Sequence, residues 1–210
     1  CLVGGVLPRD RAESEALLSC LTPVGGALHA AGLKLNLVAR VRTGALADSA
    51  AFGSLDLASV AACCDGVQVL GFGPGNYDPT MPTGPEPLAP LPWCGTVIDQ
   101  ALAWLKPEQL EWTLPGLGYA WGMKGAAPEE IPYSRWQALV RAHPPEHRDP
   151  ASGELFLRRD GTEVWVNDAI SLTSKLWEAR QRGLSSAALW GLGSEDPRLW
   201  ALLDSLPAVF

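Results

Sequence analysis

Five short apolar segments, each followed by a segment with helical periodicity, constrain the fold more than any other feature of this sequence. The segments are rich in apolar residues, which is typical of parallel strands buried on both faces of a sheet. Chains in which such strands alternate with helices form doubly wound sheets or barrels. The sequence therefore predicts an α/β protein with a parallel sheet, and both architectures remain open at this point. The predicted strands are residues 1–7, 33–41, 67–72, 110–114 and 187–192.

The intervening segments predict helices, one β-hairpin and one long loop. Asp160-Gly161 lies between two strand-like runs, 154–158 and 163–166, and favours the two-residue turn that joins twisted antiparallel strands. The stretch 73–92 contains seven prolines and three glycines, which predicts a loop. Asn167 or Asp168 is expected to cap the helix that follows the hairpin. The predicted helices are residues 10–31, 57–63, 93–105, 134–142, 168–182 and 197–206.

Charge and motif content exclude several classes of partner. The net charge is −7, and there is no local basic cluster, so a nucleic-acid partner is not expected. Residues 1–7 are too short for a membrane span, although a lipid-modified Cys1 is a second interpretation of this apolar start. Neither G-x-G-x-x-G after the first strand nor G-x-x-x-x-G-K-[ST] occurs, and the five cysteines and three histidines lack metal-ligand spacing. We therefore expect no cofactor and no metal.

The chain resembles glycoside hydrolase family 18, most specifically in its second half. The matching segments agree with the family in order, spacing and residue type. The branch that the chain resembles most contains bacterial spore-cortex and spore-germination glucosaminidases, while residues 1–30 match more weakly. The segments are Pro87–Trp93, Leu114–Trp121, Glu163–Ala169 with Ser171-Leu172 and Lys175-Leu176, and Leu189–Trp200.

The resemblance implies a (β/α)8 barrel of the TIM type that acts on polymers of N-acetylglucosamine, either chitin or peptidoglycan. In the family's register the five predicted strands are numbers four to eight. A complete barrel needs about 250 residues, so residues 1–210 are expected to form a single partial-barrel domain. Residues 143–167 would be a small inserted hairpin subdomain before the last helix and strand. An open sheet edge would allow self-association.

The family's catalytic positions are altered in this sequence. In the family, a Glu at the end of strand four protonates the leaving oxygen, and the sugar's own acetamido group attacks the anomeric carbon. The resemblance places Gly4 at this acid position, and glycine cannot donate a proton. The family also has a Tyr-Asp pair at the end of strand six, where this chain has Gly71-Phe72-Gly73. Tyr77-Asp78 follows five residues later, so a rearranged loop would bring Tyr77 to the substrate and make Asp78 a substitute catalytic group.

The family's sugar-binding positions are better preserved. Trp190 matches the Trp that forms the floor of the central sugar subsite, and Tyr119 and Trp121 are expected to line the same cleft. Packing in the barrel core is the competing interpretation of all three residues. The chain has nine Trp against three Tyr and four Phe, and flat aromatic faces suit the apolar face of a pyranose ring.

Three hypotheses follow for the function. The first is a pseudoenzyme that binds glycans containing N-acetylglucosamine and has weak or lost hydrolase activity. The second is an active glycosidase that hydrolyses β-1,4 amino-sugar polymers by substrate-assisted retention. The third is a structural or protein-binding remnant that neither binds nor cleaves glycans. The family resemblance suggests a bacterial protein that is secreted or located in the cell envelope or spore.

Overall fold

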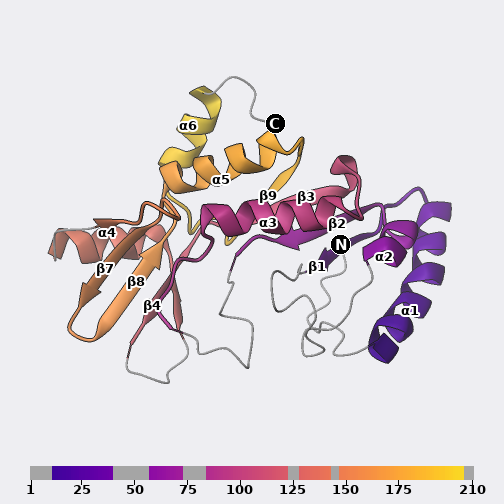
Figure 1. The fold of residues 1–210 in the computed structure, drawn as a ribbon, viewed down its shortest axis with the longest axis horizontal. Helices are drawn as coiled ribbons and strands as arrows, with labels where there is room; N and C mark the ends of the chain where they lie inside the picture. Colours follow the sequence, from indigo (N-terminus) through magenta and orange to yellow (C-terminus); the bar gives the residue numbers. More distant parts are fainter. Residues whose placement is uncertain (1–10, 40–56, 73–83, 123–127, 143–146, 206–210) are drawn as a thin grey trace.

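The computed structural model describes residues 11–39, 57–72, 84–122, 128–142 and 147–205. The strands in these ranges form two sheets, shown in Figure 1. The first is parallel, with the order β1 (Asn36–Ala39), β2 (Gly66–Leu70), β3 (Leu110–Pro115) and β9 (Ala187–Trp190). The second is antiparallel, with the order β5 (Glu129–Ile131), β4 (Gly118–Trp121), β8 (Thr162–Val166), β7 (Leu155–Arg159) and β6 (His147–Arg148).

The helices lie close to their predicted positions. The first continues through Pro23 without a break. A Cβ atom at Gly25 would lie 2.7 Å from the carbonyl oxygen of Cys63, so glycine lets this helix approach the next one closely. The helices are α1 (Arg11–Ala30), α2 (Leu57–Cys63), α3 (Leu91–Leu102), α4 (Tyr133–Ala142), α5 (Ala169–Gln181) and α6 (Arg198–Ser205), and a short 3-10 turn covers Pro107–Gln109.

The order of the parallel strands decides between the two architectures left open by the sequence. The strands follow one another across the sheet in chain order, as in a (β/α)8 barrel, whereas a doubly wound sheet reverses its order at a switch point. The helices α2, α3 and α5 contact this sheet (Figure 1). Side chains such as Val67, Val69 and Trp112 are buried in the core that these helices share with the sheet. The fold is therefore of the barrel type, although the described strands do not close into a barrel.

Trp112 is the largest side chain of this core and is fully buried. Its ring lies against the end of β2, where a Cβ atom at Gly71 would be only 2.3 Å from a ring carbon. Real Cβ atoms do not approach that closely, so the packing of Trp112 requires glycine at position 71.

The antiparallel sheet and α4 form a second unit, which we call the lobe. The predicted β7–β8 hairpin is confirmed, and its turn residues Asp160 and Gly161 have φ angles of 49° and 77°, as a two-residue turn of this kind requires. The interval predicted as an inserted subdomain, 143–167, contains β6, β7 and β8. Strands β4, β5 and β6 were not predicted, because they are only two to four residues long and form through pairing with neighbours rather than through a strong local preference.

Candidate functional site

The carboxyl ends of the parallel strands lie along one edge of the first sheet. Ligands bind at this edge in barrels. The last strand residues there are Ala39, Leu70, Pro115 and Trp190, and the register places Trp190 beside Pro115.

Trp190 presents an accessible aromatic ring at this edge. Leu189 packs against the helix-side core, and successive strand side chains point to opposite faces, so Trp190 lies on the other face of the sheet. Its residue exposure is 41%. The ring centroids of Trp190 and Phe72 are 6.1 Å apart with the planes inclined by 48°, which is a favourable tilted contact. Trp190 therefore lies at the end of the last strand, as the sequence predicts, and its contact with a sugar stays a prediction.

Tyr119 and Trp121 lie on β4 of the lobe, in a buried aromatic cluster. Their exposures are 5% and 4%, and they pack with Leu88, Leu117 and Trp165. The Tyr119 hydroxyl donates a hydrogen bond to Glu130 at 3.1 Å. Contact of Tyr119 and Trp121 with a glycan stays a prediction, since both side chains are largely covered.

Leu117 connects the aromatic cluster to the loop that follows Trp190. Gly191 has a φ of 79°, and a Cβ atom there would lie 3.0 Å from a methyl carbon of Leu117. The parallel-sheet edge and the aromatic cluster of the lobe therefore adjoin one another.

Glu195 also lies in this region, although the sequence analysis did not single it out. Gly116 directly follows β3, and a Cβ atom at Gly116 would lie 3.1 Å from the Cβ atom of Glu195. The amide of Gly193 and the indole N–H of Trp200 donate to its carboxylate at 2.6 and 3.0 Å. Partial burial opposes ionisation of Glu195, but hydrogen bonds from its own amide, Trp200 and Gly193 outweigh this and lower its pKa. Glu195 is therefore a hydrogen-bond acceptor at neutral pH and a poor general acid.

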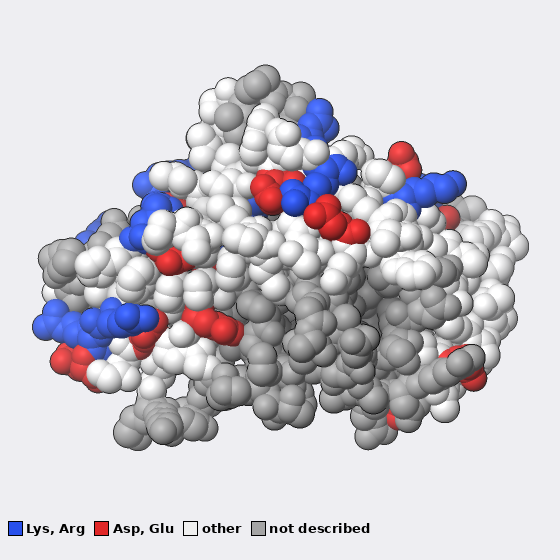
Figure 2. Space-filling model, in the orientation of Figure 1, with Lys and Arg blue, Asp and Glu red and all other residues white. Residues whose placement is uncertain are grey.

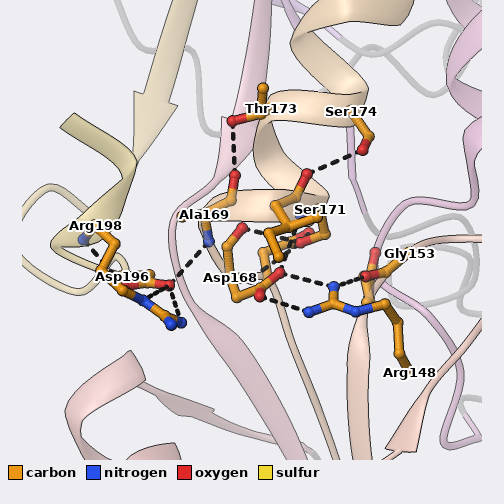
Figure 3. A network of polar contacts seen from close by, with 12 residues as sticks. Arg148, Gly153, Asp168, Ala169, Ser171, Thr173, Ser174, Asp196 and Arg198 are labelled. Atoms are coloured by element: carbon orange, nitrogen blue, oxygen red, sulfur yellow. Dashed lines mark hydrogen bonds and ion pairs between the residues drawn. The ribbon is translucent and has the colours of Figure 1, made fainter. Parts of the chain in front are cut away.

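Asp168 and Asp196 tie α5 to the lobe and to the chain before α6 (Figure 3). Asp168 caps α5 by accepting from the amide of Ser171 at 3.0 Å, and Arg148 of β6 binds both of its carboxylate oxygens at 3.0 and 2.8 Å. Burial raises the pKa of Asp168, but the hydrogen bonds from Arg148 and Ser171 more than compensate, so the pKa is lowered.

Asp196 joins two helices through backbone bonds. It accepts from the amide of Ala169, the first residue of α5, at 3.0 Å and from the amide of Arg198, the first residue of α6, at 3.1 Å. Asp196 therefore caps the start of α6 and links it to the start of α5.

A fully buried ion pair joins the lobe to α5, and its carboxylate also binds the segment that precedes α3. Lys175 of α5 donates to Glu154 at 2.6 Å and also to Asn167, and neither Lys175 nor Glu154 is exposed. The same Glu154 carboxylate accepts from the amides of Leu88 and Ala89 at 2.7 and 2.8 Å. Glu154 therefore positions the backbone that places Leu88 in the aromatic cluster. The sequence contained no signal for this pair, because its partners come from distant segments.

The remaining predicted catalytic positions, Gly4, Tyr77 and Asp78, lie outside the described residues. The part of the chain that the structure covers contains no cluster of His, Cys, Asp or Glu that could hold a metal ion. Within the same ranges, no helix is long and apolar enough to cross a membrane.

Comparison with known proteins gives matches in structure alone. A scan against protein-family models finds no match, and neither does a search of curated proteins. Among solved structures, a chitinase from Chromobacterium violaceum aligns with a TM-score of 0.79 and 24% identity, over 93% of this chain and 62% of the other. The Bacillus megaterium spore cortex-lytic enzyme has the same TM-score at 19% identity, over 93% of this chain and 46% of that one. A family 18 chitinase from Cycas revoluta in complex with (GlcNAc)3 gives a TM-score of 0.76 at 16% identity, over 92% of this chain and 63% of the other.

These similarities show the fold. The described residues share the fold of two chitinases, one of them of glycoside hydrolase family 18, and of a spore cortex-lytic enzyme, so the resemblance found in the sequence is confirmed at the level of the fold. The chain spans less than two thirds of the length of each of these three structures.

Proposed function

We propose that this protein binds glycans built from N-acetylglucosamine, either chitin or peptidoglycan strands, and hydrolyses them weakly or not at all. The observation that carries the proposal is the exposed ring of Trp190 at the carboxyl edge of a parallel sheet with the family 18 fold. An indole face in this position suits the apolar C–H face of a pyranose, and the ring is supported by its contact with Phe72.

The proposal that hydrolysis is weak or lost rests on the residues that would transfer protons. By the resemblance to family 18, the acid position falls at Gly4, and glycine has no side chain to supply a proton. Glu195, the carboxylate beside the end of β3, has a lowered pKa and accepts hydrogen bonds instead of donating them. Since general acid–base steps contribute about 10²–10⁴-fold to rates, a site without a positioned acid would turn over very slowly.

Titration with N-acetylglucosamine oligomers, followed by Trp fluorescence, tests the binding proposal. We expect saturable quenching for the wild type and loss of binding for Trp190→Ala. Trp177→Ala is the matched control, because Trp177 is similarly exposed on α5 and should bind the oligomers normally. Equal binding by both variants would assign the quenching to another tryptophan, and a folded wild type that gives no quenching would refute the proposal. Peptidoglycan strands stripped of peptide, used as a second probe, distinguish the two glycans.

An active glycosidase is the second candidate, because Tyr77-Asp78 preserves the residue types of the family's acetamido-binding pair. It predicts release of reducing ends from chitin oligomers or peptidoglycan, and loss of that release in Asp78→Asn. A structural or protein-binding remnant predicts neither glycan binding nor turnover.

We also propose that the chain self-associates through the sheet edge at β9. In the described residues β9 pairs on one side only, with β3, which leaves hydrogen-bonding groups on its other side. Sedimentation velocity over a wide concentration range tests this. A dimer at high concentration is expected, and a monomer throughout would refute the proposal.

A further inference from the structure

A hollow of about 510 Å³ lies on the face of the lobe sheet opposite the aromatic cluster. Side chains alternate along β4, so Ala120 points to the face opposite Tyr119 and Trp121. Ala120 lines the hollow together with Leu157 of β7 and Val164 of β8. The hollow is therefore separate from the parallel-sheet edge and from the proposed glycan site.

The hollow has an apolar floor and a wall from α4. Leu139 and Arg135 are four residues apart on α4, so they share one face of the helix, and both line the hollow. The small side chain of Ala120 leaves space between the sheet and this helix. The volume falls within the range of about 300–1,000 Å³ that is typical of small-ligand sites.

Two ion pairs contribute charges of both signs to the rim. Arg135 pairs with Glu129, and Arg159 pairs with Asp160 at 3.3 Å. In Figure 2, basic and acidic side chains lie next to one another over the part of the molecule where Figure 1 places β7 and β8. All four side chains are about half exposed or more, and such pairs contribute little to stability. A ligand that carries both charges can therefore replace these contacts at low cost.

We propose that this hollow binds a short zwitterionic peptide with small apolar side chains. The apolar side chains of the peptide would lie on Ala120, Leu157 and Val164. Its carboxylate would accept from the guanidinium of one rim pair, and its ammonium group would donate to the carboxylate of the other pair. The balanced rim charge favours a zwitterion over a simple anion or cation. The floor contains no aromatic ring, so it does not favour a sugar.

Calorimetric titration with tri-alanine tests the proposal on the whole chain. We expect binding of tri-alanine and much weaker binding of N-acetyl-tri-alanine amide, which has the same side chains but no end charges. In amide NMR spectra, tri-alanine should shift the signals of Ala120, Leu139 and Leu157. No binding, equal binding of both peptides, or shifts confined to other parts of the chain would overturn the proposal.

Three variants sharpen the test. Arg159→Gln should weaken tri-alanine binding about fivefold, as expected for one partly exposed charge contact. Ala120→Leu should weaken it by placing a larger side chain on the apolar floor of the hollow, and a normal thermal melt checks that this variant is folded. Arg141→Gln changes an exposed charge on α4 that does not line the hollow, so its affinity should equal that of the wild type. Equal weakening by Arg141→Gln and Arg159→Gln would refute a specific site.

This inference does not depend on the proposed function. Arg159→Gln should bind N-acetylglucosamine oligomers like the wild type, because its side chain lies away from Trp190. A protein that binds the oligomers but not tri-alanine would therefore refute the peptide site alone. A protein that binds tri-alanine but not the oligomers would refute the proposed glycan binding alone.

Discussion

The parallel sheet and the lobe are built on different principles. In the parallel sheet, apolar side chains of strands and helices bury one another in a single core around Trp112. In the lobe, the sheet carries an apolar cluster on each of its faces, with Trp136 on one side and Trp165 on the other. Polar bonds from Glu154 and Arg148 fasten the lobe to the rest of the molecule. Apolar packing thus determines how the elements of the parallel sheet are arranged. Hydrogen bonds and ion pairs, in contrast, set the position of the lobe.

Removing the buried attachment of the lobe should have the largest effect on stability. Glu154→Ala leaves the Lys175 ammonium group buried without its counter-charge and removes the acceptor of two backbone amides. We expect the free energy of unfolding to fall by about 3–5 kcal/mol, measured by urea denaturation at neutral pH. Glu129→Ala is the control, because it breaks an exposed pair and should cost at most about 1 kcal/mol. Similar losses in both variants would show that the buried pair is not the main attachment.

A steric change in the parallel sheet should have a smaller effect. Gly71→Ala places a methyl group against the ring of Trp112, and such overpacking typically costs about 1–3 kcal/mol. Gly84→Ala should be nearly neutral, because a Cβ atom at Gly84 would meet nothing within 4 Å. Thermal and urea unfolding of the two variants measure the difference. A Gly71→Ala protein as stable as the wild type would show that Trp112 can move aside.

Acid should weaken the attachment of the lobe through Asp168. The folded-state pKa of Asp168 lies below its ordinary value of 3.8. Its ionised form therefore stabilises the fold above about pH 4, and this contribution is lost as the pH falls through the folded-state pKa. Asp168→Asn should lower stability at neutral pH by about 1 kcal/mol, because asparagine can still accept from the Ser171 amide but loses the charge pair with the partly exposed Arg148. The unfolding midpoint should also depend less on pH between 5 and 3 than in the wild type, and parallel curves for the two proteins would contradict this assignment.

The smallest effect on stability is expected at the residue with the proposed functional role. Trp190→Ala removes an exposed ring whose one described aromatic partner is Phe72. A change of about 0.5 kcal/mol in unfolding free energy is expected, as for surface substitutions in general. A loss of several kcal/mol would instead make Trp190 a structural residue and would favour the core-packing interpretation.

The same contrast explains what could be predicted from the sequence. Segments such as α3 and the strand that contains Trp112 were predicted, because their apolar pattern is itself the cause of their burial. The Asp160-Gly161 turn was predicted because its residue types are suited to positive φ angles. Strands β5 and β6 have no such pattern and exist only through their partners. The pairing of Glu154 with Lys175 and the position of Glu195 depend on contacts between distant segments, which no local pattern encodes.

The place of the lobe along the chain has a consequence for the order of folding. Strands β3 and β9 pair in the parallel sheet, yet the whole lobe lies between them in the sequence. Pairing them before the lobe is compact would require closure of a long flexible loop, which is entropically costly. The β7–β8 hairpin is the most local pairing in the lobe and can form early, which shortens the effective loop. We therefore expect substitutions in the hairpin turn to slow folding, whereas substitutions at the β3–β9 contact should mainly speed unfolding.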